Sequence, residues 1–174
     1  IDPLAFAWRP GDEGVYIADQ VGMVYRLDTS GATEPLVDLR DRVTPFEAGT
    51  ERGLLGIAFG PDGRLYIDFT DRQSDTFVIS MAMSGNVADP ASEREVLFID
   101  QPGFGHKGGT LVFDADGNLY ISSGDGAASK GRDAQDPAKL LGAILRIRPN
   151  ADAPGYTIPP DNPFVGHPTI RPEK

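Results

Sequence analysis

Short hydrophobic runs separated by turn-forming residues recur along the chain. Leu65-Tyr66-Ile67 and Leu119-Tyr120-Ile121 are uninterrupted apolar runs, and an Asp-Gly pair precedes each of them, at residues 62–63 and 116–117. The glycine of such a pair supplies the positive φ of a hairpin turn. A continuous apolar run is typical of a strand that is covered on both faces. The pattern therefore predicts hairpins made of short, buried strands.

This hairpin unit is repeated. Its three copies are residues 6–19, 59–67 and 113–121. Each copy has a tyrosine at the same place, and Tyr16, Tyr66 and Tyr120 are separated by 50 and 54 residues. Such a period is too long for most helical solenoids and fits the blades of a β-propeller. The tyrosines are thus expected to mark the centres of three blades.

Runs rich in Val, Ile, Phe and Tyr predict further strands between the repeats. They cover residues 23–27, 35–39, 77–81, 95–99 and 143–147. About four strands per period make residues 1–149 an all-β, partial β-propeller of roughly three blades. Only Asp136-Pro137 suits the start of a helical turn, which would run through Leu141.

The last part of the chain has a different composition. Residues 150–174 contain six prolines and few periodic apolar positions, so a Pro-rich loop outside the blades is predicted there. Because closed propellers have about 4–8 blades, three periods leave sheet edges open. The chain is therefore expected to be about the N-terminal half of a larger protein.

Composition and charge restrict the classes of partner that the chain can bind. The chain is 40% hydrophobic and 24% charged, as in ordinary globular proteins, and its 21 glycines and 15 prolines agree with many tight turns. The net charge of −10 is spread along the chain, which disfavours nucleic acid and anionic lipid as partners. No apolar run approaches the roughly 20 residues of a membrane helix. The absence of cysteine excludes disulfides and thiolate zinc sites.

One histidine has a suggestive position. His106 lies in the glycine-rich segment 103–109, directly before a predicted strand, where propeller loops line one end of the central channel. An imidazole there could act as a general base, and Asp125, at the end of the neighbouring strand, could orient it. The alternatives are a histidine that only bonds loop backbone and an Asp-Gly turn. His167 is interpreted as a solvated surface residue.

Two further polar residues are candidates for the same channel. Glu51 and Arg52 precede the second repeat, so we expect them near the substrate, with a plain surface ion pair as the alternative. Asp114 and Asp116 resemble part of a calcium loop, but the third acidic ligand is missing. No metal ligand is therefore assigned in this chain.

Four segments together resemble one known family. They are residues 51–59 (ERGLLGIAF), 105–113 (GHKGGTLVF), 119–125 (LYISSGD) and 141–147 (LGAILRI). They are similar to the glucose/sorbosone dehydrogenase family of soluble, pyrroloquinoline quinone (PQQ)-dependent aldose sugar dehydrogenases. The resemblance implies a six-bladed propeller with PQQ and Ca²⁺ at one end of its channel. It also implies oxidation of an aldose to a lactone, with an electron acceptor as the second partner. The location implied by the resemblance is periplasmic or extracellular, although residues 1–4 show no feature of an export signal.

The resemblance also implies roles for individual residues. His106 matches the family's catalytic base and Asp125 the carboxylate that supports it. Glu51 stands where the glucose-oxidising branch has a sugar-contacting glutamine, Gly105 where it has an aspartate, and Lys107 where many relatives have asparagine. Glucose itself is therefore not implied as the substrate. The family's quinone-binding and calcium-binding residues lie beyond Lys174, so this chain alone is expected to be inactive.

Two other classes of function stay open. One is a non-catalytic binding propeller without a cofactor, against which the presence of His106 argues. The other is a metal-dependent lactonase propeller, which needs several acidic ligands that converge in the channel.

Overall fold

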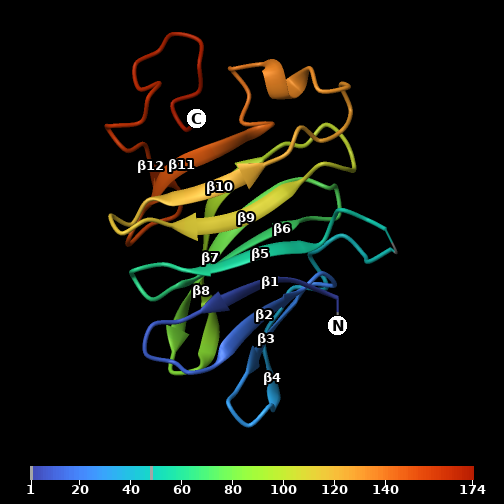
Figure 1. Ribbon diagram of the computed structural model, residues 1–174, viewed down its shortest axis with the longest axis vertical. Helices are drawn as coiled ribbons and strands as arrows, with labels where there is room; N and C mark the ends of the chain where they lie inside the picture. The colour runs from blue at the N-terminus through green and yellow to red at the C-terminus, as the bar shows by residue number, and fades with distance from the viewer. Residues whose placement is uncertain (1, 48) are drawn as a thin grey trace.

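The chain folds into three four-stranded antiparallel sheets that lie one beside the next (Figure 1). The computed structural model describes residues 2–47 and 49–174. The first sheet consists of β1 (Pro3–Trp8), β2 (Val15–Asp19), β3 (Met23–Leu27) and β4 (Thr33–Asp38). The second consists of β5 (Leu54–Phe59), β6 (Leu65–Thr70), β7 (Thr76–Ser84) and β8 (Val87–Ile99). The third consists of β9 (Gly108–Phe113), β10 (Leu119–Ser123), β11 (Ala143–Pro149) and β12 (Tyr156–Thr157). Each sheet follows chain order, as propeller blades do, which confirms the predicted fold class.

The strands agree with the sequence pattern except where pairing extends them. β3 has the predicted bounds, whereas β8 begins at Val87, eight residues before the predicted start. β7 and β8 form a long hairpin around Gly85, whose φ of 59° fits a tight turn. Within residues 150–174, Tyr156 and Thr157 pair with β11 and become the outermost strand of the third blade.

The predicted helical turn from Asp136 to Leu141 is wrong. The described residues contain a single 3₁₀ turn, η1 (Asp133–Gln135), and Asp136 follows it with an extended backbone (φ −83°, ψ 109°). The Asp136 side chain accepts a hydrogen bond from the Ala138 N–H at 3.0 Å, so it forms a local Asx turn instead of a helix cap. In the described part of the chain, no helix has the length and apolar character needed to cross a bilayer.

Adjacent blades are held together by aromatic pairs. Tyr16 on β2 packs against Phe59 on β5, with ring centroids 4.6 Å apart and planes at 69°. Tyr66 on β6 packs in the same way against Phe113 on β9, at 4.8 Å and 67°. Edge-to-face pairs of this kind contribute about 0.5–1.5 kcal/mol beyond the area that they bury. Because the same contact joins both pairs of blades, it repeats the same blade-to-blade arrangement.

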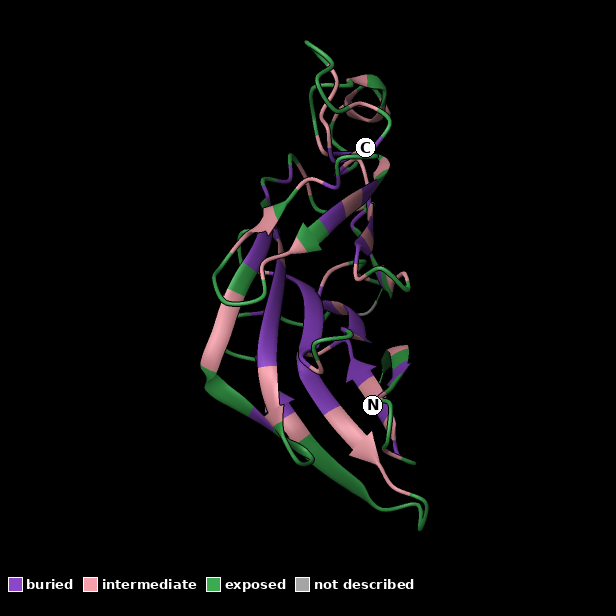
Figure 2. Ribbon diagram, turned by 90° about the vertical axis from the view of Figure 1, so that its left-hand side faces the viewer, coloured by how far each residue is buried: buried purple, intermediate pink, exposed green. Residues whose placement is uncertain are grey.

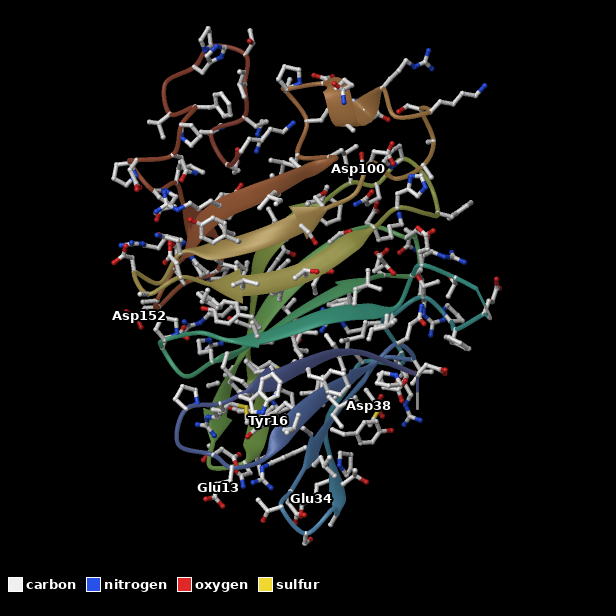
Figure 3. All side chains as sticks on the ribbon, viewed as in Figure 1. Glu13, Tyr16, Glu34, Asp38, Asp100 and Asp152 are labelled. Atoms are coloured by element: carbon white, nitrogen blue, oxygen red, sulfur yellow. The ribbon has the colours of Figure 1, made fainter. Side chains whose placement is uncertain are left out.

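The same tyrosines also fix the hairpin turns. The hydroxyl group of Tyr16, which is labelled in Figure 3, donates to Asp12 at 2.6 Å. The Tyr66 hydroxyl donates to Asp62 at 2.9 Å. Arg26 donates two hydrogen bonds to Asp12, at 2.5 and 2.8 Å. These hydrogen bonds hold the pKa of Asp12 well below its usual range. Each tyrosine therefore links its own turn to the next blade.

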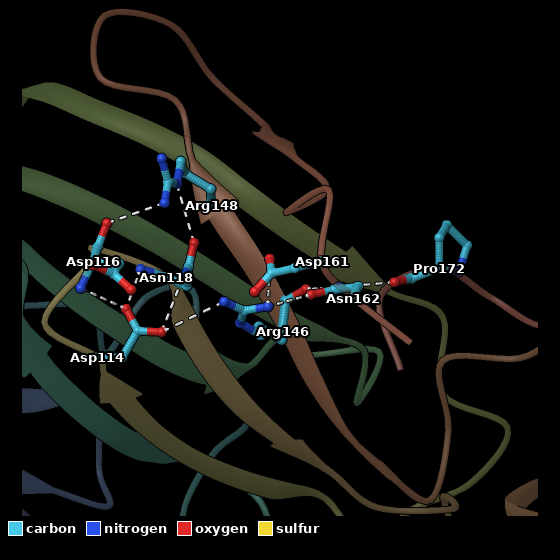
Figure 4. Close-up of polar contacts among 8 residues, drawn as sticks. All are labelled: Asp114, Asp116, Asn118, Arg146, Arg148, Asp161, Asn162 and Pro172. Atoms are coloured by element: carbon cyan, nitrogen blue, oxygen red, sulfur yellow. Dashed lines mark hydrogen bonds and ion pairs between the residues drawn. The ribbon is translucent and has the colours of Figure 1, made fainter. Parts of the chain in front are cut away.

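The C-terminal segment is attached to the third blade by polar contacts (Figure 4). The Arg146 side chain on β11 donates to Asp161 and Asn162, at 2.9 and 3.0 Å. The Asn162 amide donates in turn to the carbonyls of Arg146 and Pro172, both at 2.8 Å. Residues 158–174 therefore lie along β11 although they form no regular element.

The second blade contains an unusual buried carboxyl group. Figure 2 shows buried strands, in purple, in the middle of the molecule. All six residues of β6 are buried. Asp68 in this strand is completely buried, and neither carboxyl oxygen has a hydrogen-bond partner among the described residues. It lies against β9, since a Cβ atom on Gly109 would be 3.2 Å from Asp68 Oδ1. Burial raises the pKa of Asp68 to about 8, so the carboxyl group is mostly protonated at neutral pH.

We predict that Asp68 makes folding pH-dependent. Its pKa is higher in the folded chain (about 8) than the ordinary value of 3.8, so the folded state keeps a proton that the unfolded state releases. Stability should be lost as the pH rises from about 4 to about 8. Each pH unit between the two pKa values lowers the free energy of unfolding by about 1.4 kcal/mol. The total loss is therefore at most roughly 6 kcal/mol relative to Asp68→Asn.

Urea unfolding between pH of about 5 and 8 measures this difference. Asp68→Asn should lose less stability over this range than the unchanged chain. The exposed Asp152→Asn variant is the matched control and should follow the unchanged chain. If the free energy of unfolding of Asp68→Asn and of Asp152→Asn changes with pH in the same way, Asp68 ionises in the folded chain at little cost in stability. That result would contradict the prediction.

Candidate functional site

His106 and Asp125 lie together at one end of the third blade. His106 precedes β9 and Asp125 follows β10, and these antiparallel strands pair Ser123 with Gly108. The imidazole Nδ1 lies 2.7 Å from Asp125 Oδ1. The structure thus places side by side the two residues that the sequence predicted to interact.

A close backbone approach makes this pairing possible. The Gly124 N–H donates to the Lys107 carbonyl at 3.0 Å, and the Gly126 N–H donates to the His106 carbonyl at 3.3 Å. A Cβ atom on Gly124 would lie 1.6 Å from the His106 carbonyl oxygen, so only glycine fits there. His106 itself has a φ of 52°, in the left-handed region that non-glycine residues seldom adopt. The surrounding hydrogen bonds compensate for this conformation.

The hydrogen bond between the two side chains orients the imidazole. Asp125 Oδ1 also accepts the Ala127 N–H at 3.0 Å, and this bond together with the one to His106 lowers the pKa of Asp125. An ionised carboxylate can only accept hydrogen bonds, so Nδ1 of His106 donates, and in the neutral form of the ring Nε2 carries the lone pair. The His106 side chain is 62% exposed, whereas Asp125 is 12% exposed. Nε2 is therefore available to a substrate, and the carboxylate is sheltered behind the ring.

Glu51 brings the second blade into the site. It lies in the loop before β5, and its Oε2 accepts a hydrogen bond from the backbone N–H of His106. The loops before β5 and β9 both lie at the right-hand ends of the sheets in Figure 1, opposite the turns that join β5 to β6 and β9 to β10. Glu51 therefore contacts the backbone of the histidine, and the described ion pairs do not join it to Arg52.

Arg52 is hydrogen-bonded to residues other than His106. Its guanidinium group donates to Thr50 Oγ1 at 3.2 Å and to Ser74 Oγ at 3.1 Å. It also lies 5.1 Å from the ring centroid of Phe104, which is exposed. A pocket of about 280 Å³ lies here, lined by residues that include Arg52, Phe104 and Glu51. A role for Arg52 in substrate binding remains a prediction.

Lys107 is a structural residue that the sequence did not identify. Its side chain is buried, and Nζ donates to the carbonyls of Ser74, at 2.8 Å, and of Gly103. Burial lowers the pKa of Lys107 to about 8. The lysine joins the loop that carries His106 to the second blade. The sequence feature that could have revealed this role is a lysine within the glycine-rich segment that leads into a buried strand.

The other candidates lie outside this arrangement. His167 is exposed, and its Nδ1 accepts hydrogen bonds from the N–H groups of Thr169 and Ile170, at 3.3 and 3.1 Å. Asp114 accepts the N–H groups of Asp116 and Asn118 and forms a turn. Across residues 2–47 and 49–174, no three His, Asp or Glu side chains converge to form a metal site.

The sequence is similar to known proteins over nearly its whole length. The family model for "Glucose / Sorbosone dehydrogenase" matches residues 2–173. The aldose sugar dehydrogenase of Escherichia coli is 28% identical over 94% of this chain and 44% of its own length. Human Hedgehog-interacting protein is also 28% identical, over 94% of this chain and 27% of its length. The chain therefore spans less than half of these curated relatives.

Solved structures agree with the sequence matches. The crystal structure of the Escherichia coli enzyme superposes with a TM-score of 0.77 at 26% identity, over 99% of this chain and 50% of that one. The PQQ-bound aldose sugar dehydrogenase of Streptomyces coelicolor gives a TM-score of 0.76 at 27% identity, over 97% and 49%. The three blades thus correspond to one half of these propellers.

We predict that Lys107 stabilises the loop that carries His106. Lys107→Met should lower the free energy of unfolding by about 1–3 kcal/mol, because the carbonyls of Ser74 and Gly103 lose their buried donor. Chemical denaturation of both proteins measures the difference. The exposed Lys130→Met variant is the control and should change little. Equal losses in both variants would contradict the assigned role.

Proposed function

This chain belongs to the glucose/sorbosone dehydrogenase family, and we propose that it supplies the proton-accepting half of a PQQ-dependent aldose sugar dehydrogenase. The observation that carries the proposal is the 2.7 Å contact between His106 Nδ1 and Asp125 Oδ1 beneath an exposed ring edge. General-base catalysis by histidine needs this combination of an oriented ring and an accessible nitrogen.

His106 acts as the base on the anomeric hydroxyl group. Nε2 accepts the hydroxyl proton while the C1–H bond breaks with its electron pair, so that C1 becomes the carbonyl carbon of a lactone. The imidazole gains a positive charge in this step, and the adjacent Asp125 carboxylate stabilises it. Asp125 also keeps the ring in the tautomer that leaves Nε2 unprotonated.

PQQ, when bound, supplies the acceptor for the hydride from C1. The residues around His106 fit the side of the site where the sugar reacts. They do not fit a cradle for the carboxylates of the quinone, because Glu51 and Asp125 are acidic and Arg52 and Lys107 are engaged with Ser74. Residues that bind the cofactor are therefore not assigned in this chain. Among the described residues, no three His, Asp or Glu side chains form a group that could hold a metal ion.

Glu51 has two tasks in this proposal. One carboxylate oxygen accepts the His106 N–H and holds the loop. A carboxylate accepts at both oxygens, so the second can receive a sugar hydroxyl group. The adjoining pocket of about 280 Å³, next to Arg52, is large enough for part of a sugar ring. The substrate class is an aldose, and an electron acceptor reoxidises the cofactor at a periplasmic or extracellular location.

A chimera tests the proposal most directly. Residues 1–174 replace the matching half of the Escherichia coli aldose sugar dehydrogenase, and dye reduction is followed with PQQ, Ca²⁺ and a panel of aldoses. The chimera should turn over, and residues 1–174 alone should not. His106→Ala should lower kcat by about 100-fold or more, the usual contribution of a general base. His167→Ala is the matched control and should retain activity.

The alternatives give different results. Unchanged kcat in His106→Ala would exclude the histidine as the base. A folded chimera without turnover on any aldose would favour the non-catalytic class, to which the similarity with Hedgehog-interacting protein draws attention. Lactone hydrolysis without oxidation would favour a lactonase.

A further inference from the structure

One turn of the second blade contacts both loops of the candidate site. It consists of residues 71–75, between β6 and β7. From the loop before β5, the Arg52 guanidinium group donates to Ser74 Oγ at 3.1 Å. From the loop before β9, Lys107 Nζ donates to the Ser74 carbonyl at 2.8 Å. A single residue therefore accepts one hydrogen bond from each of the two loops that form the site.

The backbone of Ser74 is strained. Its φ of 77° lies in the left-handed region, which side chains other than glycine seldom adopt. The residue is also 1% exposed, so its side chain lies inside the structure. Glycine adopts this conformation without a steric penalty, so the turn by itself favours glycine. The hydroxyl group is what serine adds at this position, and its hydrogen-bond partner is Arg52.

The shape of the turn depends on other hydrogen bonds. The Asp71 carboxylate accepts the N–H groups of Gln73 and Asp75, both at 2.9 Å. The Ser74 N–H donates to the Asp71 carbonyl at 3.0 Å. None of these contacts uses the Ser74 hydroxyl group. Removal of that hydroxyl group should therefore leave the turn in place.

Arg52 keeps donors for a ligand. A guanidinium group has five N–H donors. Toward the described residues, Nε donates to Thr50 Oγ1 at 3.2 Å and Nη1 donates to Ser74 Oγ at 3.1 Å. The ion pair between Nη2 and Glu47 is loose, at 3.9 Å. The group lines the pocket of about 280 Å³, so its remaining N–H groups can donate to a sugar hydroxyl group there.

We propose that Ser74 is a positioning residue for substrate binding. Its hydroxyl group fixes the guanidinium group of Arg52 at the pocket, and its carbonyl group fixes the loop of His106 through Lys107. The inference rests on the proposed function, because it assigns Arg52 to the aldose. A side chain that is already held in place loses less conformational freedom when it binds a ligand. Ser74 thus lowers the cost of binding without contact to the sugar.

Removal of the hydroxyl group by two different substitutions tests the proposal. Ser74→Gly suits the φ of 77°, whereas Ser74→Ala keeps the strained backbone and should unfold at a lower urea concentration. In residues 1–174, without PQQ or sugar, phenylglyoxal should modify Arg52 about threefold faster or more in both variants. Arg72, exposed in the same turn and bonded to the Asp41 carbonyl, is the internal control and should react at an unchanged rate.

Kinetics of the chimera test the consequence for the substrate. Both Ser74 variants should raise KM for the aldose by about three- to tenfold and leave kcat within about twofold. Arg52→Met should also raise KM, and Ser74→Gly should add nothing in that background, because the two residues act as one unit. Ser30→Gly, at an exposed turn of the first blade, is the matched control and should change neither constant.

The outcomes separate this proposal from the proposed function. An unchanged rate of Arg52 modification in Ser74→Gly would overturn the role of Ser74, and so would additive effects of Ser74→Gly and Arg52→Met on KM. Faster modification in Ser74→Ala alone would assign the effect to lost stability and overturn it as well. A chimera without turnover would overturn the proposed function, whereas the modification of Arg52, which needs neither PQQ nor sugar, still decides whether Ser74 holds the guanidinium group.

Discussion

The packing of a tyrosine on one blade against a phenylalanine on the next is the interaction on which the rest of the structure depends. The hydrogen-bonded strand ladders lie within single blades, so other contacts connect one blade with the next. The Tyr16–Phe59 and Tyr66–Phe113 pairs make that connection with nearly the same distance and angle. Because the hydroxyl groups of these tyrosines also bind the turns before their strands, the position of each blade is linked to its own hairpin.

The candidate site is a consequence of this arrangement. Glu51 belongs to the loop before the second blade, and His106 belongs to the loop before the third. Their contact requires β5 and β9 to lie very close together, and a Cβ atom on Gly56 would be 1.9 Å from the Gly109 carbonyl oxygen. Lys107 fastens the same loop to Ser74 of the second blade. The site therefore forms between two blades.

The sequence predicted features that depend on local pattern. The repeat, most strand positions and the proximity of His106 and Asp125 follow from strand alternation and antiparallel pairing. The two-residue strand β12 has no such pattern, because it exists only through pairing with β11. The preference of Asp136-Pro137 for a helix start was overridden by an extended backbone at Asp136. The buried states of Asp68 and Lys107 come from the neighbouring blade, which no single segment reveals.

The tautomer of His106 tests the central claim, that the structure holds this ring ready to accept a proton at Nε2. The chain has two histidines, and they make opposite hydrogen bonds: Nδ1 of His106 donates to Asp125, whereas Nδ1 of His167 accepts from Thr169 and Ile170. Nuclear magnetic resonance of the labelled ring nitrogens, at a pH where both rings are neutral, distinguishes these states. The account predicts a proton on Nδ1 of His106 and on Nε2 of His167. A proton on Nε2 of His106 would contradict it.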